Sequence, residues 1–496
     1  MTGDELPASE SDMRRHLQLR EAVFAALEGL DVEGVPIASL VEEALDMDCS
    51  TGRLRDPRRA SWTLRALRPA LAVLPWIERA RGRRRAWPRA LAPGRVLLDV
   101  ASTGHNCRRI WEPIARRLGP ERVVLLVPVQ ATMRGAMPGA LHGFEWVSPA
   151  RFPVDWSRWR AQVAAGYPDW IARLRGLHAH RVTDRGARRL AVTIALQALR
   201  IHQAHAVMEF YRPSALLSMA DRGASGAPLV GAARRRGVPT LTIVHCPAGR
   251  TFGRTFLPLN ADRLLVWGEY QRDVFEGFGL PAERIAVVGC PGTQPPGPDD
   301  VGGAADRMRL PGAPDRRRRV LVVTGPMRDE WRSAWFGEIA EAARRLPEAA
   351  FVVRVHPSER AAFYRSRAEG LDNVAVLENV DAGLEDTLSA VDAVVVHGSS
   401  VGLDALVRGK DLFVLDCLPF TLGTMREVLA AGAAAQVTRG SELADALRDA
   451  WTGPSTAEAR RRAGRAFADR FLAAYGDEAA RRVVAEIDHA AFAPAC

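Results

Sequence analysis

Residues 392–406 read "DAVVVHGSSVGLDAL", and this stretch decides the fold class. The apolar run 393–396 has the length of one buried strand, and apolar residues at helical spacing begin directly after Ser400. Between the two lie His397, Gly398 and Ser399, which are polar or small. A strand that passes through so short a turn into a helix is the repeating unit of a parallel sheet covered by helices on both faces.

The same unit recurs through the second half of the chain. Strand patterns are expected at residues 319–325, 350–356, 373–378, 392–398 and 411–416. Helical patterns are expected at 332–346, 384–391, 400–409 and 456–490. This alternation predicts a doubly wound α/β domain.

The first half shows a second series of the same kind. Its expected strands lie at 95–101, 121–129, 214–219, 239–245, 262–268 and 284–289. Helical patterns cover 106–119, about 185–211 and the stretch "APLVGAARRRG" after the third strand. The predicted class is therefore α/β, with two tandem doubly wound Rossmann-like domains.

Domain boundaries follow from changes in pattern. Residues 1–92 have helical periodicity and little strand character, so we expect a helical N-terminal appendage. The stretch from 289 to 316 is rich in Gly, Pro and Asp, which is typical of a linker. We therefore expect a first Rossmann-like domain over 93–290, a linker over 291–317, a second domain over 318–455 and a C-terminal helix over 456–496.

Composition narrows the classes of function. The 496 residues carry a net charge of +10, but Lys410 is the only lysine and the arginines are spread along the chain. We interpret this as codon usage in a GC-rich bacterial genome and expect no nucleic-acid partner. Six isolated cysteines, no long apolar segment and a polar N-terminus lead us to expect a cytoplasmic protein without disulfides or a zinc site.

Polar or small residues end three strands of the second half. His356 is followed by Pro357, His397 is followed by the two serines, and Gly325 ends "RVLVVTG". Carboxyl ends of parallel strands meet at one edge of a sheet, where helix starts attract anions. We expect a phosphate site there. A plain helix cap at the serines and an ordinary strand-end histidine at His356 are the alternatives.

The pattern resembles a known family. A strand ending in His-Pro, followed by a strand ending in Ser-Ser before "GLDALVRGK", is similar to the donor half of GT-B glycosyltransferases. In the first half, 212–246 and 261–291 resemble the acceptor half of these enzymes. The likeness covers about residues 95–480 and is nearest to bacterial capsule-type enzymes, namely polysialyltransferases, other sialyltransferases and teichoic-acid polyol-phosphate transferases.

The resemblance implies a role for each matching residue. His356 would contact the donor phosphate or act as general acid, and 377–380 would line the nucleobase. The other donor-side residues that it implies are Gly325, Arg354, Pro357, Val380, His397, Gly398, Ser399, Ser400 and Asp404.

Departures from related patterns favour inversion without a metal. The helix lacks the Gln-Glu-Glu of UDP-sugar 2-epimerases and the paired glutamates of many retaining enzymes, and we expect no Asp-x-Asp metal site of the GT-A kind. Inversion requires a general base in the first half. Four residues at strand ends are candidates for this base, namely Asp99, His105, Asp221 and His245. Asn106 is a further acceptor-side residue.

We therefore expect a nucleotide-sugar-dependent glycosyltransferase of bacterial surface-glycan or secondary-metabolite synthesis, with no cofactor. The alternatives are a CDP-polyol phosphotransferase, a non-hydrolysing UDP-sugar 2-epimerase and a non-catalytic nucleotide-binding subunit. The expected partners are the donor and a glycan or lipid-linked acceptor. Arginines and tryptophans over 57–89 suggest peripheral contact with the inner membrane face, and a solvated helical cap is the alternative.

Overall fold

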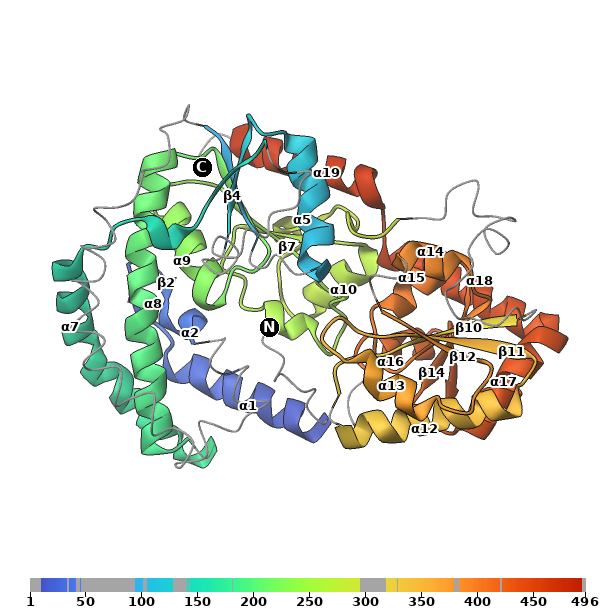
Figure 1. Ribbon diagram of the computed structural model, residues 1–496. Helices are drawn as coiled ribbons and strands as arrows, with labels where there is room; N and C mark the ends of the chain where they lie inside the picture. The colour runs from blue at the N-terminus through green and yellow to red at the C-terminus, as the bar shows by residue number, and fades with distance from the viewer. Residues whose placement is uncertain are drawn as a thin grey trace.

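The computed structural model describes most of the chain and confirms the predicted fold class. The described residues are 10–33, 35–41, 45, 94–100, 105–127, 141, 143–180, 182–294, 318–327, 329–378, 383–419 and 422–492. Two parallel sheets form two Rossmann-like domains that lie side by side (Figure 1). The basic stretch 57–89, and with it the expected membrane contact, lies outside the described residues.

The first sheet has seven parallel strands in the order β5-β4-β3-β6-β7-β8-β9. Its central strands are short and buried on both faces, because helices cover both sides of the sheet. The order reverses direction between β3 and β6, which creates the crevice where open α/β sheets bind ligands. The strands are β3 (Val96–Asp99), β4 (Val123–Leu126), β5 (Glu145–Val147), β6 (Ala215–Ser218), β7 (Thr240–Ile243), β8 (Arg263–Val266) and β9 (Ile285–Val287).

The second sheet repeats this plan with six parallel strands in the order β12-β11-β10-β13-β14-β15. Its reversal point lies between β10 and β13. Register pairs Val322 of β10 with Val353 of β11 and with Val395 of β13, so the three strands end at one edge. The strands are β10 (Arg318–Val323), β11 (Ala349–Arg354), β12 (Val374–Leu377), β13 (Ala393–Val396), β14 (Asp411–Leu415) and β15 (Ala435–Val437).

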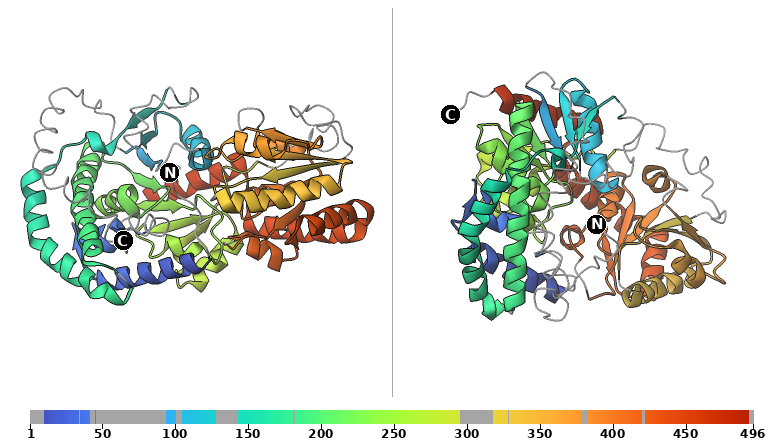
Figure 2. Two further views of the ribbon diagram at one scale, coloured as in Figure 1. Left: turned by 60° about the horizontal axis from the view of Figure 1, so that its bottom comes forward. Right: turned by 60° about the vertical axis from the view of Figure 1, so that its left-hand side comes forward.

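Helices of the first domain pack on both faces of its sheet. Figure 2 shows α7 and α8 running together along the outer side of this domain. Apolar residues such as Ile194, Ala198 and Ile201 recur at three- and four-residue spacing along α8 and are buried. The helices are α5 (His105–Leu118), α7 (Trp156–Arg175), α8 (Asp184–Tyr211), α9 (Gly223–Arg234) and α10 (Glu269–Gly277).

The N-terminal segment is part of the first domain's outer layer. It comprises α1 (Glu10–Ala26), the two-residue strands β1 (Asp31–Val32) and β2 (Val35–Pro36), and α2 (Ile37–Leu40). Leu19, Val23 and Val35 share one apolar cluster with Trp170 and Ile194 of α7 and α8. The described part of the expected appendage is therefore docked on the domain, and it contains a small antiparallel hairpin besides its helices.

Helices of the second domain cover its sheet in the same way. Helix α12 (Figure 1) buries Trp335, Phe336 and Ile339 against the strands. The helices are α12 (Asp329–Arg345), α13 (Ala361–Arg367), α14 (Leu384–Ser389), α15 (Val401–Val407), α16 (Met425–Ala430), α17 (Gly440–Thr452) and α18 (Pro454–Phe471).

The chain ends by crossing back to the first domain. The single helix expected over 456–490 is two helices, α18 and α19 (Gly476–Phe492), and α19 packs against α5 (Figure 1). Glycine permits the break, because Gly476 has a φ of +50°. The crossing segment bonds to the end of the first sheet, where Cys290 N donates to Ala474 O at 2.9 Å and Gly476 N donates to Cys290 O at 3.2 Å. Two adjacent segments thus join the domains.

Candidate functional site

The carboxyl edges of the two sheets face each other across the domain interface. The loop after β7 contacts the helix that follows β14, because Thr424 Oγ1 donates to Pro247 O at 2.7 Å. Three residues further along each segment, Arg250 N donates to Glu427 Oε1 at 2.6 Å. Loops that leave β7 in one domain and β14 in the other therefore meet directly.

A second contact joins the helices that follow β3 and β13. Asp404 of α15 is buried, and its carboxylate accepts hydrogen bonds from Thr293 Oγ1 at 3.1 Å and from Arg109 Nη1 at 3.5 Å. Two Rossmann domains thus meet edge to edge at their strand ends, and a C-terminal helix returns to the first domain. This is the GT-B fold. Asp404 already binds two residues across the interface, and its expected contact with a ribose stays a prediction.

On the donor side, His356 follows β11 and is held by its neighbours in the loop. Its backbone N–H donates to Thr324 Oγ1 at 2.9 Å, and its ring Nδ1 lies 2.8 Å from Ser358 Oγ. Nδ1 also accepts the backbone N–H of Ser358 at 3.2 Å. An amide can only donate, so Nδ1 carries the lone pair and Nε2 carries the proton. Burial lowers the pKa of His356, which keeps this ring neutral at pH 7.

A buried carboxylate that sequence reasoning missed supports this loop. The side chain of Glu359 is 1% exposed, and it accepts hydrogen bonds from Thr324 Oγ1 at 2.5 Å and from Tyr364 OH at 2.9 Å. Arg332 Nε of α12 lies 2.8 Å from its second oxygen. Burial raises the pKa of Glu359, against the effect of these partners. Because Thr324 links Glu359 to the His356 backbone, Glu359 is a positioning residue.

Other expected donor residues have varied surroundings. Arg354 points toward α14, where its Nη1 donates to Thr387 Oγ1 at 3.3 Å and Gly383 O at 3.4 Å, and burial lowers its pKa. A Cβ added at Gly325 would meet no atom of the described residues within 4 Å, so they leave open space beside the end of β10. Pro357 is exposed. Val380 lies outside the described residues.

The turn after β13 combines one buried histidine with an exposed glycine and two partly exposed serines. His397 is 2% exposed, and its Nδ1 donates to Leu415 O at 3.1 Å, so the ring ties β13 to β14. Ser400 occupies the N-cap position of α15 without a capping hydrogen bond from its side chain, and Ser399 Oγ accepts the N–H of Val401 at 3.3 Å. Helix α15 has only seven residues, which limits the attraction that its start exerts on an anion.

In the first domain, both aspartates at strand ends bind their own domain. Asp99 is buried at the last position of β3 and accepts a hydrogen bond from the hydroxyl of Ser218 at 2.9 Å. Asp221 is 1% exposed, and its Oδ2 accepts the backbone N–H groups of Asn260 at 2.5 Å and Ala261 at 3.0 Å. Burial raises the pKa of Asp221. These contacts give both carboxylates a role in holding the fold.

His245, at the end of β7, has the opposite ring arrangement to His356. Its Nδ1 lies 2.8 Å from Met219 O, and a carbonyl can only accept, so Nδ1 carries the proton and Nε2 the lone pair. The ring packs against Phe256 with centroids 5.5 Å apart. Burial lowers the pKa of His245 and keeps the ring neutral. Neither His245 nor His356 uses Nε2 for a hydrogen bond within the described chain.

The structure places the backbone of His105 and Asn106 at the start of α5, next to the end of β3. Their side chains lie outside the described set. Among the described residues, no three His, Cys, Asp or Glu side chains are grouped to hold a metal ion. None of the helices in the described part combines the length and apolar character needed to cross a bilayer.

No protein-family model and no curated protein sequence matches the chain. Solved structures resemble it at low identity. A UDP-GlcNAc 2-epimerase from Neisseria meningitidis bound to UDP-GlcNAc is 12% identical, with a TM-score of 0.48 over 80% of this chain and 99% of that one. The glycosyltransferase of kitacinnamycin is 17% identical, with a TM-score of 0.48 over 80% of this chain and 99% of that one. The wall teichoic acid polymerase TagF is 13% identical, with a TM-score of 0.45 over 87% of this chain and 99% of that one. Such values say nothing about reaction or substrate.

Proposed function

We propose that this protein is an inverting, metal-independent glycosyltransferase that uses a nucleotide-activated sugar. One observation carries the proposal. Two neutral imidazoles end strands at facing edges of two Rossmann domains, and they are held in opposite tautomers. His245 offers a lone pair at Nε2, as a general base requires, and His356 offers an N–H at Nε2, as a phosphate donor requires.

The two rings suit the two ends of one displacement. His245 Nε2 accepts the proton of an acceptor hydroxyl while that oxygen attacks the anomeric carbon. The bond from this carbon to the phosphate oxygen breaks, and its electron pair leaves with the nucleotide. His356 Nε2–H donates a hydrogen bond to the departing phosphate, whose negative charge grows during the step. Attack opposite the leaving group inverts the anomeric centre.

The neutral state of His356 favours one of its two expected roles. A ring with a lowered pKa is already deprotonated at pH 7, so it has no second proton to give. It acts as a hydrogen-bond donor rather than as a general acid. Glu359 and Thr324 keep its backbone in place, and the open space beside Gly325 leaves room for the phosphate.

The test begins with a nucleotide panel on the full-length protein. CMP, CDP, UDP, GDP and dTDP are compared by thermal shift, because a ligand at a hundredfold excess over its Kd adds about 2.7 kcal/mol to stability. The matching donor is then followed by NMR, with candidate acceptors added. Nucleotide release with inversion at the anomeric carbon supports the proposal.

Other outcomes have distinct meanings. Transfer of a polyol phosphate from a CDP-linked donor would identify a phosphotransferase, and interconversion of a UDP-sugar without an acceptor would identify an epimerase. Nucleotide binding without turnover would indicate a non-catalytic subunit. If none of the five nucleotides shifts the unfolding temperature, the proposal fails.

A further inference from the structure

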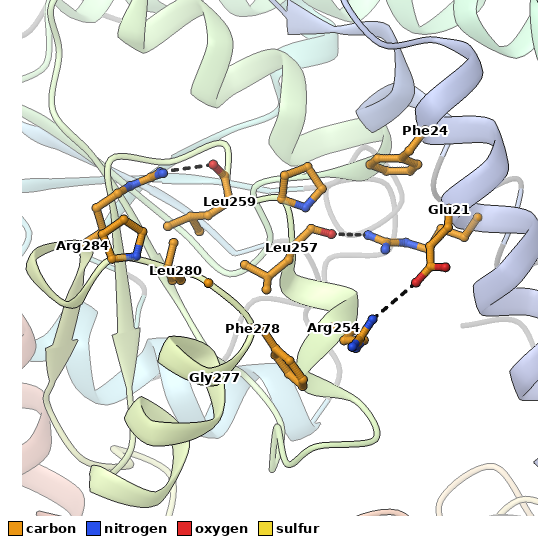
Figure 3. A pocket seen from close by; sticks show the side chains of 13 residues that line it. Glu21, Phe24, Arg254, Leu257, Leu259, Gly277, Phe278, Leu280 and Arg284 are labelled. Atoms are coloured by element: carbon orange, nitrogen blue, oxygen red, sulfur yellow. Dashed lines mark hydrogen bonds and ion pairs between the residues drawn. The ribbon is translucent and has the colours of Figure 1, made fainter.

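A cavity of about 590 Å³ lies on the first domain, and its lining includes none of the residues assigned to the displacement. It opens to the surface and is lined by α1, by the segment 254–259 and by the connection from α10 to β9 (Figure 3). Its volume falls within the 300–1,000 Å³ that is typical of small-molecule sites. The described structure assigns it no role in the displacement proposed above.

Its charges are mostly positive. Arg20, Arg254 and Arg284 line the cavity, and Glu21 is the one carboxylate among the lining residues. Arg20 Nη2 donates to Leu257 O at 2.5 Å and Arg284 Nη2 donates to Leu259 O at 3.1 Å, so both guanidinium groups brace the wall. The cavity therefore carries an excess of fixed positive charge.

Arg254 differs from the other two arginines. Its side chain is 57% exposed, and its hydrogen-bonding partner within the described chain is Glu21, at 3.5 Å. Glu21 is itself 61% exposed, and ion pairs of this kind contribute little stability. Another anion can therefore take the place of Glu21 beside Arg254.

Apolar side chains lie next to this exchangeable ion pair. Arg254 rests on the ring of Phe278, 5.1 Å from its centroid, and Arg20 rests on Phe24 at 4.6 Å. Figure 3 shows Leu257 and Leu280 on the same side of the cavity as Phe278. The stacked ring holds the guanidinium in place, so the cationic group borders an apolar surface.

We propose that this cavity binds an amphipathic anion, that is, a carboxylate or phosphate carried on an apolar chain. The head group replaces Glu21 at Arg254, and the chain covers Phe278, Leu257 and Leu280. Each buried methylene strengthens binding by about fourfold, so affinity rises with chain length until the cavity is filled. The site is separate from the strand edges and does not depend on the reaction proposed there.

Calorimetry on the full-length protein tests this with decanoate, decyl phosphate and decanol as probes, each below its micellar concentration. Saturable one-to-one binding is expected for both ten-carbon anions. Decanol, which lacks the charge, and hexanoate, a further probe with a shorter chain, should each bind at least tenfold more weakly. Tighter binding of decanoate identifies a carboxylate site, and tighter binding of decyl phosphate a phosphate site. Equal binding of decanol, or no saturable binding of either anion, overturns the proposal.

Variants locate the site. Arg254→Gln should weaken anion binding at least tenfold, and Glu21→Gln should strengthen it a few-fold because the resident competitor is removed. Arg272→Gln, on the exposed side of α10 and outside the cavity, is the matched control and should bind as the parent does. Unfolding temperatures check that each variant is folded. Unchanged binding in folded Arg254→Gln, or an equal loss in Arg272→Gln, overturns the proposal.

Discussion

His245 and His356 end strands in two sheets of the same order, yet their rings are held in opposite ways. In the first domain a carbonyl, Met219 O, receives the Nδ1 proton. In the second an amide, Ser358 N, donates to the Nδ1 lone pair. The backbone group that faces Nδ1 thus decides what Nε2 can do. Two domains with one topology can therefore present a proton acceptor on one edge and a donor on the other.

The largest effect is expected from removing the proposed base, His245. His245→Asn should lower turnover by about 10²–10⁴-fold, because a positioned general base contributes that factor. Nucleotide affinity should stay the same, since His245 belongs to the acceptor side. Steady-state kinetics and calorimetry measure the two quantities. His202→Asn is the control, a buried histidine between α7 and α8 that should leave turnover unchanged; near-parental turnover in His245→Asn would remove it from the mechanism.

Removing the hydrogen-bond donor His356 should have the next largest effect on turnover. His356→Ala should lower turnover by about 10²–10³-fold, which is typical when one hydrogen bond to a developing charge is lost. Nucleotide binding should weaken only slightly, because that bond strengthens as the bond to carbon breaks. His489→Ala, an exposed histidine on α19, serves as control. An equal loss of binding and turnover would show that His356 contributes to ground-state binding alone.

The pH profile sharpens the distinction between the two rings. Burial lowers both pKa values from about 6.5, so both rings are neutral at pH 7. Activity should stay level from pH 7 to 9, and should fall about tenfold per unit below the lowered pKa of His245. If His356 instead acted as a general acid, activity would also decrease on the alkaline side of its lowered pKa, and this decrease would begin below pH 6.5. A bell-shaped profile of kcat/KM would therefore contradict the hydrogen-bonding role.

Asp221 should have the smallest effect on turnover. Asp221→Ala leaves the buried N–H groups of Asn260 and Ala261 without an acceptor, so it should lower the free energy of unfolding by about 1–3 kcal/mol for each group. Turnover per folded molecule should stay unchanged. Urea denaturation and activity normalised to folded protein measure both quantities. Asp273→Ala, an exposed carboxylate on α10, is the control. Lost turnover at unchanged stability would make Asp221 the base.

Hydrophobic pattern predicted the fold well where strands are buried on both faces. Eleven strands expected from apolar runs are present in the two sheets. The two that the pattern missed, β5 and β15, are three-residue edge strands with the sequences "EWV" and "AQV". Each contains a polar residue, Glu145 or Gln436, so neither carries a continuous apolar run. The break between α18 and α19 was also missed, because helical periodicity continues on both sides of Gly476.

The positions of site residues were easier to predict than their partners. Strand ends placed His245 and His356 at the sheet edges, because parallel strands end together. The ring tautomers depend on Met219 O and the Ser358 backbone, which periodicity does not reveal. Glu359 was missed because "HPSER" looks like a solvated turn, whereas folding brings Arg332 from α12 to bury its carboxylate. Asp404 was expected on the donor side, and its partners Arg109 and Thr293 lie outside the second domain, which periodicity does not reveal.

The chain that returns from the second domain is fastened to the end of the first sheet. Residues around Cys290 and Ala474 run side by side and are hydrogen-bonded. A Cβ at Gly289 would come within 2.5 Å of Ala474 O, so the close approach of the two segments requires glycine there. The last helix therefore starts from a fixed point on the first domain, and α19 belongs to that domain's packing although the chain just before it lies in the other domain.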